Sequence, residues 1–159
     1  RQGGSVALIS DAGMPTVSDP GQRLVGATVG AGLHVEGIPG PSAVLTALAA
    51  SGLPTTPFYF GGFLPHKKGA RTTELTAALQ RDCTSVFFES PYRLADTLAI
   101  LAEAAPDRRI VVARELTKKF EEFRRGPAGI LLSHYQTKPP KGEITLLIAP
   151  VEPPKWLTW

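Results

Sequence analysis

The sequence is poor in residues that mark several protein classes. Its single cysteine, Cys83, cannot form a disulfide within the chain, which excludes a disulfide-stabilised scaffold and favours a reducing compartment. No run of 18 apolar residues occurs, so neither a transmembrane helix nor a membrane partner is expected. The three histidines lie near no cluster of cysteines or carboxylates. A metal site needs three or four clustered ligands and is therefore not expected.

Motifs of several enzyme classes are also absent. Neither G-x-G-x-x-G nor the phosphate-binding pattern G-x-x-x-x-G-K-[ST] occurs, so no motif supports phosphate binding. The G-x-S-x-G elbow of serine hydrolases is missing as well. Glycine (16) and proline (15), in contrast, make up about a fifth of the 159 residues, where ordinary usage gives roughly 12%. Without a G-X-Y period, this excess indicates loops.

The formal net charge of +3 is unevenly distributed along the chain. Residues 58–159 hold 15 basic and 11 acidic residues, and basic residues occur there in adjacent pairs at 67/68, 108/109, 118/119 and 124/125. A positive second half suits a polyanion such as RNA as partner. A solvated protein surface is the alternative interpretation.

Residues 1–54 follow the strand–loop–helix order of α/β proteins. The apolar runs Val6–Ser10 and Leu33–Ile38 predict buried strands. Between them, Asp19 and the proline that follows it predict the cap and first position of a helix that runs to about Ala31 and is ended by Gly32. Residues 42–51 predict an alanine-rich helix.

A second α/β segment is predicted over residues 55–150. Two prolines within Leu53–Pro57 favour a domain boundary there, and residues 151–159 are expected to form an irregular tail. Strands are predicted at 58–63, 84–89, 110–114, 120–125 and 143–149, and helices at 67–80, 92–104 and 128–135.

Two loops that follow the predicted strands of the first segment can hold a small ligand. In open parallel sheets, ligands bind outside the carboxyl ends of the strands. Glycine lets a backbone approach a ligand closely, and proline fixes the shape of a loop. Ordinary strand-to-helix turns are the alternative. The first loop comprises Asp11, Ala12, Gly13, Met14 and Pro15, and the second comprises Gly40, Pro41, Ser42 and Ala43.

Charged residues follow two predicted strands of the second segment. Glu89 and Arg93 come after one strand, and Glu115 and Lys118 after another. Taken alone, these residues are most simply explained as local salt bridges, although side chains at a strand end can also face a cleft.

Six segments in order carry a resemblance to a known family. The sequence resembles the small-subunit ribosomal RNA methyltransferase I family of the tetrapyrrole methylase superfamily, over nearly the whole chain to about residue 150. The matching segments are VALISDAGMPTVSDPG (6–21), GIPGPSAVLTALAASGLP (37–54), FGGFLP (60–65), FFESPYRL (87–94), ARELTKKFEE (113–122) and KGEITLLI (141–148).

The resemblance implies a two-domain α/β fold with S-adenosylmethionine (SAM) in the cleft between the domains. The first domain would have a partial parallel sheet and the second a mixed sheet. Asp11–Pro15 and Gly40–Ala43 would then form cofactor loops, although the family usually has threonine where Met14 stands. Family members begin with a PTPIGNL-like loop and an AEDTR-like segment, and neither is found here. The resemblance therefore implies an N-terminally truncated chain, and on its own this chain is expected to have little or no activity.

The implied activity is methyl transfer from SAM to the 2′-oxygen of a cytidine ribose in small-subunit ribosomal RNA. Glu115 and Lys118 are the first catalytic candidates, as general base and as cation, and Glu89 and Arg93 the next. The positive second half would hold the RNA of the ribosomal subunit, and a homodimer is left open. The expected compartment is the cytoplasm, or a plastid or mitochondrion if a transit peptide preceded this sequence.

Three other functions are compatible with the sequence. The first is methylation of a porphyrin or corrin precursor or of diphthamide, against which the SDAG and SDPG segments and RELTK argue. The second is an RNA-binding fragment without catalysis. The third is a generic nucleotide-binding α/β domain.

Overall fold

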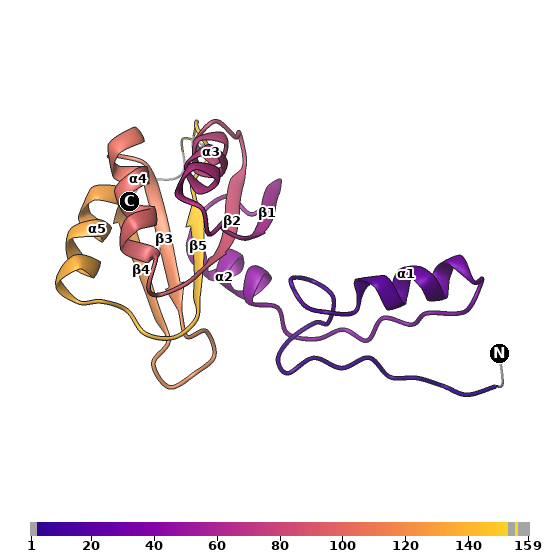
Figure 1. Cartoon of the computed structure of the whole chain (residues 1–159). Coiled ribbons are helices and arrows are strands. Elements are labelled where there is room, and N and C mark those ends of the chain that lie inside the picture. Colours follow the sequence, from indigo (N-terminus) through magenta and orange to yellow (C-terminus); the bar gives the residue numbers. More distant parts are fainter. Residues whose placement is uncertain (1–2, 153–154, 156–159) are drawn as a thin grey trace. The chain divides into compact units, whose positions relative to one another are not determined.

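The structure is a computed structural model that describes residues 3–152 and 155. It divides into two compact units, unit 1 up to Ser42 and unit 2 from Ala43 (Figure 1). The sequence predicted a boundary later, within Leu53–Pro57. The difference lies in helix α2 (Ala43–Ser51), whose buried side chains pack against the sheet of unit 2 and not within unit 1.

Unit 2 contains a five-stranded mixed sheet in the order β1-β2-β5-β3-β4. The pair β1–β2 is parallel, whereas β2–β5, β5–β3 and β3–β4 are antiparallel. This confirms the mixed sheet expected for the second segment. The strands are β1 (Phe58–Phe63), β2 (Thr84–Glu89), β3 (Arg109–Arg114), β4 (Glu122–Pro127) and β5 (Ile144–Ile148).

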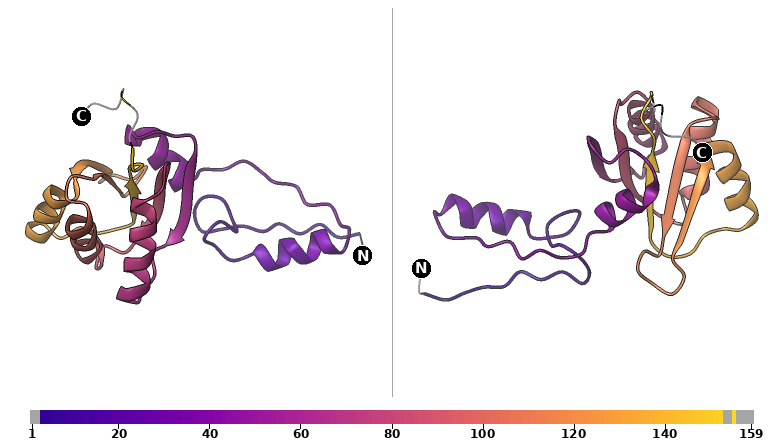
Figure 2. Two further views of the ribbon diagram at one scale, coloured as in Figure 1. Left: turned by 90° about the horizontal axis from the view of Figure 1, so that it is seen from above. Right: turned by 180° about the vertical axis from the view of Figure 1, so that it is seen from behind.

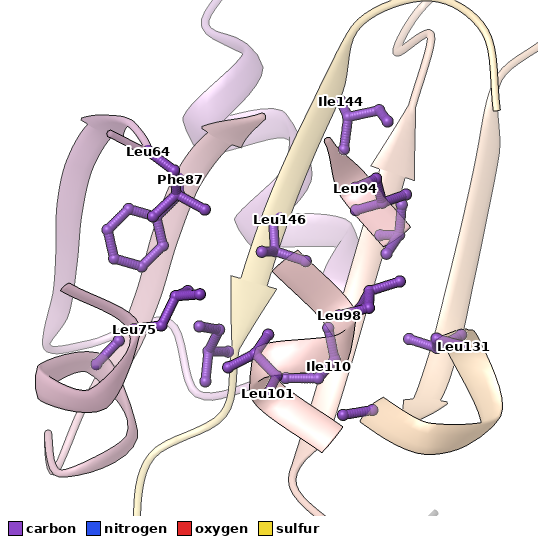
Figure 3. Packing of buried hydrophobic residues seen from close by; sticks show 14 of the residues in the cluster. Leu64, Leu75, Phe87, Leu94, Leu98, Leu101, Ile110, Leu131, Ile144 and Leu146 are labelled. Carbon is purple, nitrogen blue, oxygen red and sulfur yellow. The ribbon is translucent and has the colours of Figure 1, made fainter. Parts of the chain in front are cut away.

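Helices cover both faces of this sheet. Helices α3 (Lys68–Leu79), α4 (Leu94–Ala104) and α5 (Ala128–Thr137) lie on one face and α2 on the other (Figures 1 and 2). The two-sided cover explains why β2, β3 and β5 are nearly continuous apolar runs. Along β5, for example, Leu146 packs toward α4 with Phe87 of β2 (Figure 3), and Leu147 packs toward α2.

The sheet order brings three strand ends to one edge. Because β5 runs antiparallel to both β2 and β3, the carboxyl ends of β1, β2 and β3 lie on the same side. In this register Ile144 of β5 pairs with Glu89 on one side and with Arg114 on the other. We call this side the carboxyl edge; the β3–β4 connection projects from it at the bottom of Figure 1. All four catalytic candidates lie along it.

Unit 1 differs from its prediction. Its helix, α1, spans Gln22–Gly30, but neither Val6–Ser10 nor Leu33–Ile38 forms a strand. A strand needs a hydrogen-bonded neighbour, and within the described residues of unit 1 no ladder forms. The apolar side chains that were expected to be buried are exposed, with Val6 at 86% and Ile38 at 72%.

The start of α1 was also predicted wrongly, whereas its end was predicted correctly. Gly21 occupies the N-cap position without a side-chain cap. The carboxylate of Asp19 instead accepts a hydrogen bond from the hydroxyl of Ser10, so it braces the preceding loop. At the other end, the N–H of Gly32 donates to Val29 at 2.9 Å, which closes the helix where the glycine predicted.

The elements of unit 2 are confirmed, with small shifts at their ends. The largest shifts are of two residues, at both ends of β4, at the start of α4 and at the end of α5. Residues 151 and 152 of the predicted tail have neither helix nor strand, and most of the residues after them lie outside the described part, so the irregular tail stays a prediction. Among the described helices, none has both the length and the apolar character that a membrane span needs.

Candidate functional site

The two glycine-containing loops of unit 1 contact each other. A Cβ atom built on Gly13 would lie 3.0 Å from the carbonyl oxygen of Pro41, and one on Gly40 would lie 3.2 Å from Sδ of Met14. Both distances are shorter than ordinary van der Waals contact. The loops that the sequence singled out separately thus lie against each other, and a side chain at Gly13 would require the Pro41 carbonyl to move by a few tenths of an ångström.

The first loop and its flanking residues, from Ser10 to Asp19, are tightly turned. Gly13 has a φ of 76°, and two residues with side chains, Thr16 and Ser18, also lie in the left-handed region, at 73° and 60°. Each such residue costs of order 1–3 kcal/mol, and residues of this kind cluster at ligand clamps and active sites. The Ser10 hydroxyl donates to the Asp19 carboxylate, and its oxygen lies 3.1 Å from the carbonyl of Ala12. The loop therefore has a defined shape.

Asp11 takes no part in the hydrogen bonds that hold this loop. It is exposed, and its carboxylate has no hydrogen bond or ion pair with any residue that the structure describes. An unengaged carboxylate beside a close-packed backbone can accept hydrogen bonds from ligand hydroxyl or amino groups. Of the remaining loop residues, Pro15 and Ser42 are half-buried, and Ala43 is already the first residue of α2.

In unit 2, Lys118 joins two carboxylates at the carboxyl edge. Its Nζ donates to Oε1 of Glu115 at 3.0 Å and to Oε2 of Glu143 at 2.8 Å. The Glu115 carboxylate also accepts the backbone N–H of Glu143 at 2.9 Å. The start of the β3–β4 connection is thereby fastened to the residue that precedes β5.

Close packing around Glu115 fixes this arrangement. Glu115 and Thr117 adopt left-handed φ values of 51° and 64°, and Glu121 accepts the N–H of Thr117 at 2.6 Å. Gly142, with a φ of 86°, lies against the Glu115 side chain, so that a Cβ there would overlap the carboxylate. Strained residues held in place by their surroundings are a feature of functional sites.

The electrostatics of the cluster keep both partners charged. The backbone N–H of Glu143, and then Lys118, hold the pKa of Glu115 below its ordinary value. Hydrogen bonds to Glu143 and then Glu115 raise the pKa of Lys118. At neutral pH, Lys118 is therefore an ammonium group that cannot act as a base. It can stabilise negative charge that develops on a neighbouring oxygen.

Glu89 and Arg93, the second candidate pair, form an enclosed brace. Glu89 is 2% exposed, and its Oε1 accepts from Arg93 at 2.7 Å and from the N–H of Ser90 at the same distance. Its Oε2 accepts the hydroxyl of Thr97 at 2.6 Å. Both carboxylate oxygens of Glu89 have hydrogen-bond partners. The pair therefore connects β2 to α4 and leaves neither oxygen without a partner for a ligand to engage. A catalytic role for it stays an untested prediction.

Sequence reasoning missed Glu143 and Thr97. Glu143 precedes β5 and lies far from Glu115 in sequence, so only the sheet order brings the two together. Thr97 lies about one turn into α4 and is fully buried, as expected of an apolar residue. The signal by which Thr97 could have been found was a polar residue at a helix position that faces the core.

Several members of the basic pairs are structural. Arg108 donates to the carbonyls of Leu79 and Ala149, each at 3.1 Å. Arg125 donates to the carbonyls of Ala50 and Ser51 at the end of α2, at 2.6 and 3.0 Å. These guanidinium groups hold elements of the fold together, so the charge count overstates the surface available to a polyanion. Among the described residues, no group of three potential ligands could hold a metal ion.

Comparison with known families identifies the chain. The family model "Tetrapyrrole (Corrin/Porphyrin) Methylases" matches residues 1–131. The chain belongs to this family. Solved structures agree on the fold: cobalt precorrin-4 methyltransferase matches with a TM-score of 0.62 at 19% identity, covering 86% of this chain and 61% of that chain. Diphthine synthase matches with a TM-score of 0.64 at 14% identity, covering 86% and 57%.

Within this methylase family, closer relatives carry one name. "Ribosomal RNA small subunit methyltransferase I" of Mesorhizobium japonicum is 54% identical over 154 residues, which are 95% of this chain and 52% of the relative. Proteins of the same name from Thermotoga maritima and Bacillus subtilis are each 44% identical, covering 94% and 93% of this chain and 67% and 51% of their own lengths. The chain thus spans about half the length of most of these relatives.

Proposed function

We propose that this chain acts in the transfer of a methyl group from SAM to the ribose 2′-oxygen of a cytidine in small-subunit ribosomal RNA. The observation that carries the proposal is the shared name of relatives that are 44–54% identical over 93–95% of the chain. The compartment would be one that contains ribosomes, with the bacterial cytoplasm as the first expectation. A homodimer stays a prediction.

The loops of unit 1 fit a methyl donor. Gly13 lets the first loop approach the Pro41 carbonyl, and Gly40 lets the second loop approach the Met14 side chain. Asp11 offers a carboxylate that no described residue engages. SAM, when bound, supplies a methyl group on a positively charged sulfur. Asp11–Pro15 and Gly40–Ala43 would hold it, with the Asp11 carboxylate accepting hydrogen bonds from its hydroxyl or amino groups.

The Lys118 cluster fits the acceptor. A ribose hydroxyl is a poor nucleophile at neutral pH, and it gains negative charge as its proton leaves. Lys118, kept cationic by Glu115 and Glu143, would stabilise that charge. Oε2 of Glu115 has no hydrogen bond in the described part and could accept the proton. Its lowered pKa makes it a weak base, so we assign Lys118 the larger share.

Labelled methyl transfer tests the proposal. A protein of the relatives' full length that contains this chain is incubated with methyl-labelled SAM and small-subunit RNA, and the nucleosides are analysed after digestion. Label on the ribose of cytidine is expected; label on a base or only on protein would contradict the proposal. Lys118→Met should lower the single-turnover rate by about 10²–10³ with unchanged SAM affinity. Lys138→Met, which changes an exposed lysine outside the cluster, is the control.

A further inference from the structure

Three exposed aromatic side chains lie along the carboxyl edge. Phe63 ends β1, Tyr92 lies between β2 and α4, and Phe120 lies in the β3–β4 connection. They are 62%, 95% and 64% exposed. The seven phenylalanines and three tyrosines of the sequence all lie in unit 2. The two next most exposed, Phe58 and Tyr59, reach only 38% and 36% and lie at the opposite end of β1.

The exposure of these rings is not explained by the fold. Single exposed apolar residues are common, but the most exposed aromatic residues among those that the structure describes lie at or after three strand ends on the same side of one sheet. Phe63 is held by Phe88, with ring centroids 5.2 Å apart, and still has most of its surface in solvent. Tyr92 is almost completely exposed. Such rings offer flat faces to a partner.

Exposed lysines accompany the rings. Lys67 and Lys68 follow Phe63 at the start of α3, and Lys119 places Nζ 5.6 Å from the ring centre of Phe120. None of the three forms an ion pair with a residue that the structure describes.

The acidic groups of the same edge are engaged. Glu115 and Glu143 bind Lys118, Glu121 accepts the N–H of Thr117, and the Glu89 carboxylate is buried. Counting Lys118, four lysines stand beside the three solvent-facing carboxylates of Glu115, Glu121 and Glu143, so the edge keeps a small excess of positive charge, and Lys67, Lys68 and Lys119 have no partner among the described residues. Exposed rings interleaved with free lysines are the pattern of single-stranded nucleic acid binding, in which bases stack on the rings and cations contact the phosphates.

We propose that the carboxyl edge is a platform for single-stranded RNA. Phe63, Tyr92 and Phe120 stack on bases, and Lys67, Lys68 and Lys119 contact phosphates. Strands spaced about 4.8 Å apart place the ends of β1 and β3 about 14 Å apart in the order β1-β2-β5-β3, a distance that a few nucleotides span. The inference rests on the proposed function, since it names the surface that presents the acceptor strand beside Lys118.

Fluorescence anisotropy with a short, unstructured, labelled RNA tests the platform. Tyr92→Ala and Phe63→Ala should each weaken binding roughly 5- to 150-fold, the loss expected for one stacked base. Tyr92→Phe keeps the ring and should bind like the unaltered chain. Ile130→Ala removes an apolar side chain of similar exposure, 65%, from α5 and should change the affinity less than twofold. A duplex of the same sequence should bind more weakly than the single strand.

The lysines are tested by salt dependence. In the double variant Lys67→Ala/Lys68→Ala, the slope of log K against log salt should fall by about 1.4, the value for two lost phosphate contacts on a single strand. Lys67→Arg/Lys68→Arg keeps the charge and should keep the slope. An unchanged slope in the alanine variant would overturn the assignment of these two lysines.

Further outcomes separate the platform from the proposed function. If Tyr92→Ala and Phe63→Ala bind RNA like Ile130→Ala while cytidine ribose is still methylated, the platform is wrong and the function stands. If the variants lose RNA binding but the methyl label appears on a base or on protein, the platform stands and the function is wrong. If the unaltered chain binds no RNA, or if Tyr92→Ala only dissolves a self-association seen by sedimentation, the edge is not an RNA platform.

Discussion

Single residues of the carboxyl edge differ in how far they face solvent. The side chain of Lys118 is 48% exposed while it bridges two carboxylates. The Glu89 side chain is completely buried, and that of Arg93 is 16% exposed. A group that reacts with a bound molecule must reach it, so Lys118 suits chemistry and Glu89 suits support. The sequence shows the same pattern at Lys118 and at Glu89, a charged residue at or after the end of an apolar strand. Only the burial of the two side chains distinguishes the catalytic role from the structural one.

The Glu89 brace can be tested through stability. Glu89→Gln leaves Arg93 partly enclosed without its counter-charge, so we expect a loss of about 3–5 kcal/mol in the free energy of unfolding, measured in urea. Glu74→Gln removes an ion pair to Arg81 in which both side chains are 23–30% exposed, and should cost less than about 1 kcal/mol. Equal stability of the two variants would contradict the structural role of Glu89.

Tyr135 predicts a pH dependence of stability. It is 2% exposed, and its hydroxyl has no hydrogen-bond partner in the described structure. Burial, and then the negative charge of Glu122, raises its pKa from 10 to about 12. The contribution of neutral Tyr135 to the free energy of unfolding is therefore fully present below pH 10, and it is lost as the pH rises from 10 toward 12.

Unfolding in urea at neutral and alkaline pH measures this effect. Tyr135→Phe should be as stable as the unaltered chain or more so at pH 7, because it removes an unsatisfied buried hydroxyl. Above pH 10 its advantage should grow by up to about 2.7 kcal/mol, from 1.36 kcal/mol for each unit of pKa. Tyr92→Phe, at a 95% exposed position, is the control and should show no such growth.

At the scale of elements, the sequence predicted best where each element has its partners. Strands β2, β3 and β5 of unit 2 were recognisable because buried strands read as apolar runs, and their neighbours are present in the sheet. Val6–Ser10 is a similarly apolar run, but no described strand lies beside it to pair with. The prediction of a strand there was therefore wrong. The contact of Glu115 with Glu143 could not be predicted, because it depends on β5 lying between β2 and β3.

The contact between the two loops of unit 1 predicts an effect on donor binding. Gly13→Ala forces a side chain into a left-handed position and against the Pro41 carbonyl, at a cost of roughly 1–2 kcal/mol. We expect SAM affinity, measured by calorimetry, to fall about 5- to 30-fold. Gly26→Ala places the same methyl group in open space on α1 and is the matched control. Equal affinities would show that these loops do not hold the donor.

At the scale of the whole molecule, the two units differ in how much buried apolar packing stabilises each of them. The described residues of unit 1 include no fully buried side chain, and α1 buries none. Unit 2 has a hydrophobic cluster on each face of its sheet. Local opening is easiest where buried apolar contacts are few, so the stability of the chain is concentrated in unit 2.

Hydrogen exchange should show this division directly. Amides of residues 3–42 should exchange fastest, apart from partial protection in α1, and those of β5 and its neighbours β2 and β3 should exchange last. The edge strands β1 and β4 should lie between these limits. Strong protection in Val6–Ser10 would mean that this segment is paired in solution.

The position of β5 between β2 and β3 also determines when the sheet can be completed during synthesis. A growing chain emerges at ~5–20 residues per second, and β2 and β3 both appear before the strand that lies between them. Until Ile144–Ile148 has emerged, these two apolar strands lack a shared neighbour, and Glu143 cannot reach Lys118. The charged cluster is thus assembled late, and a nascent chain stopped before Glu143 would lack it.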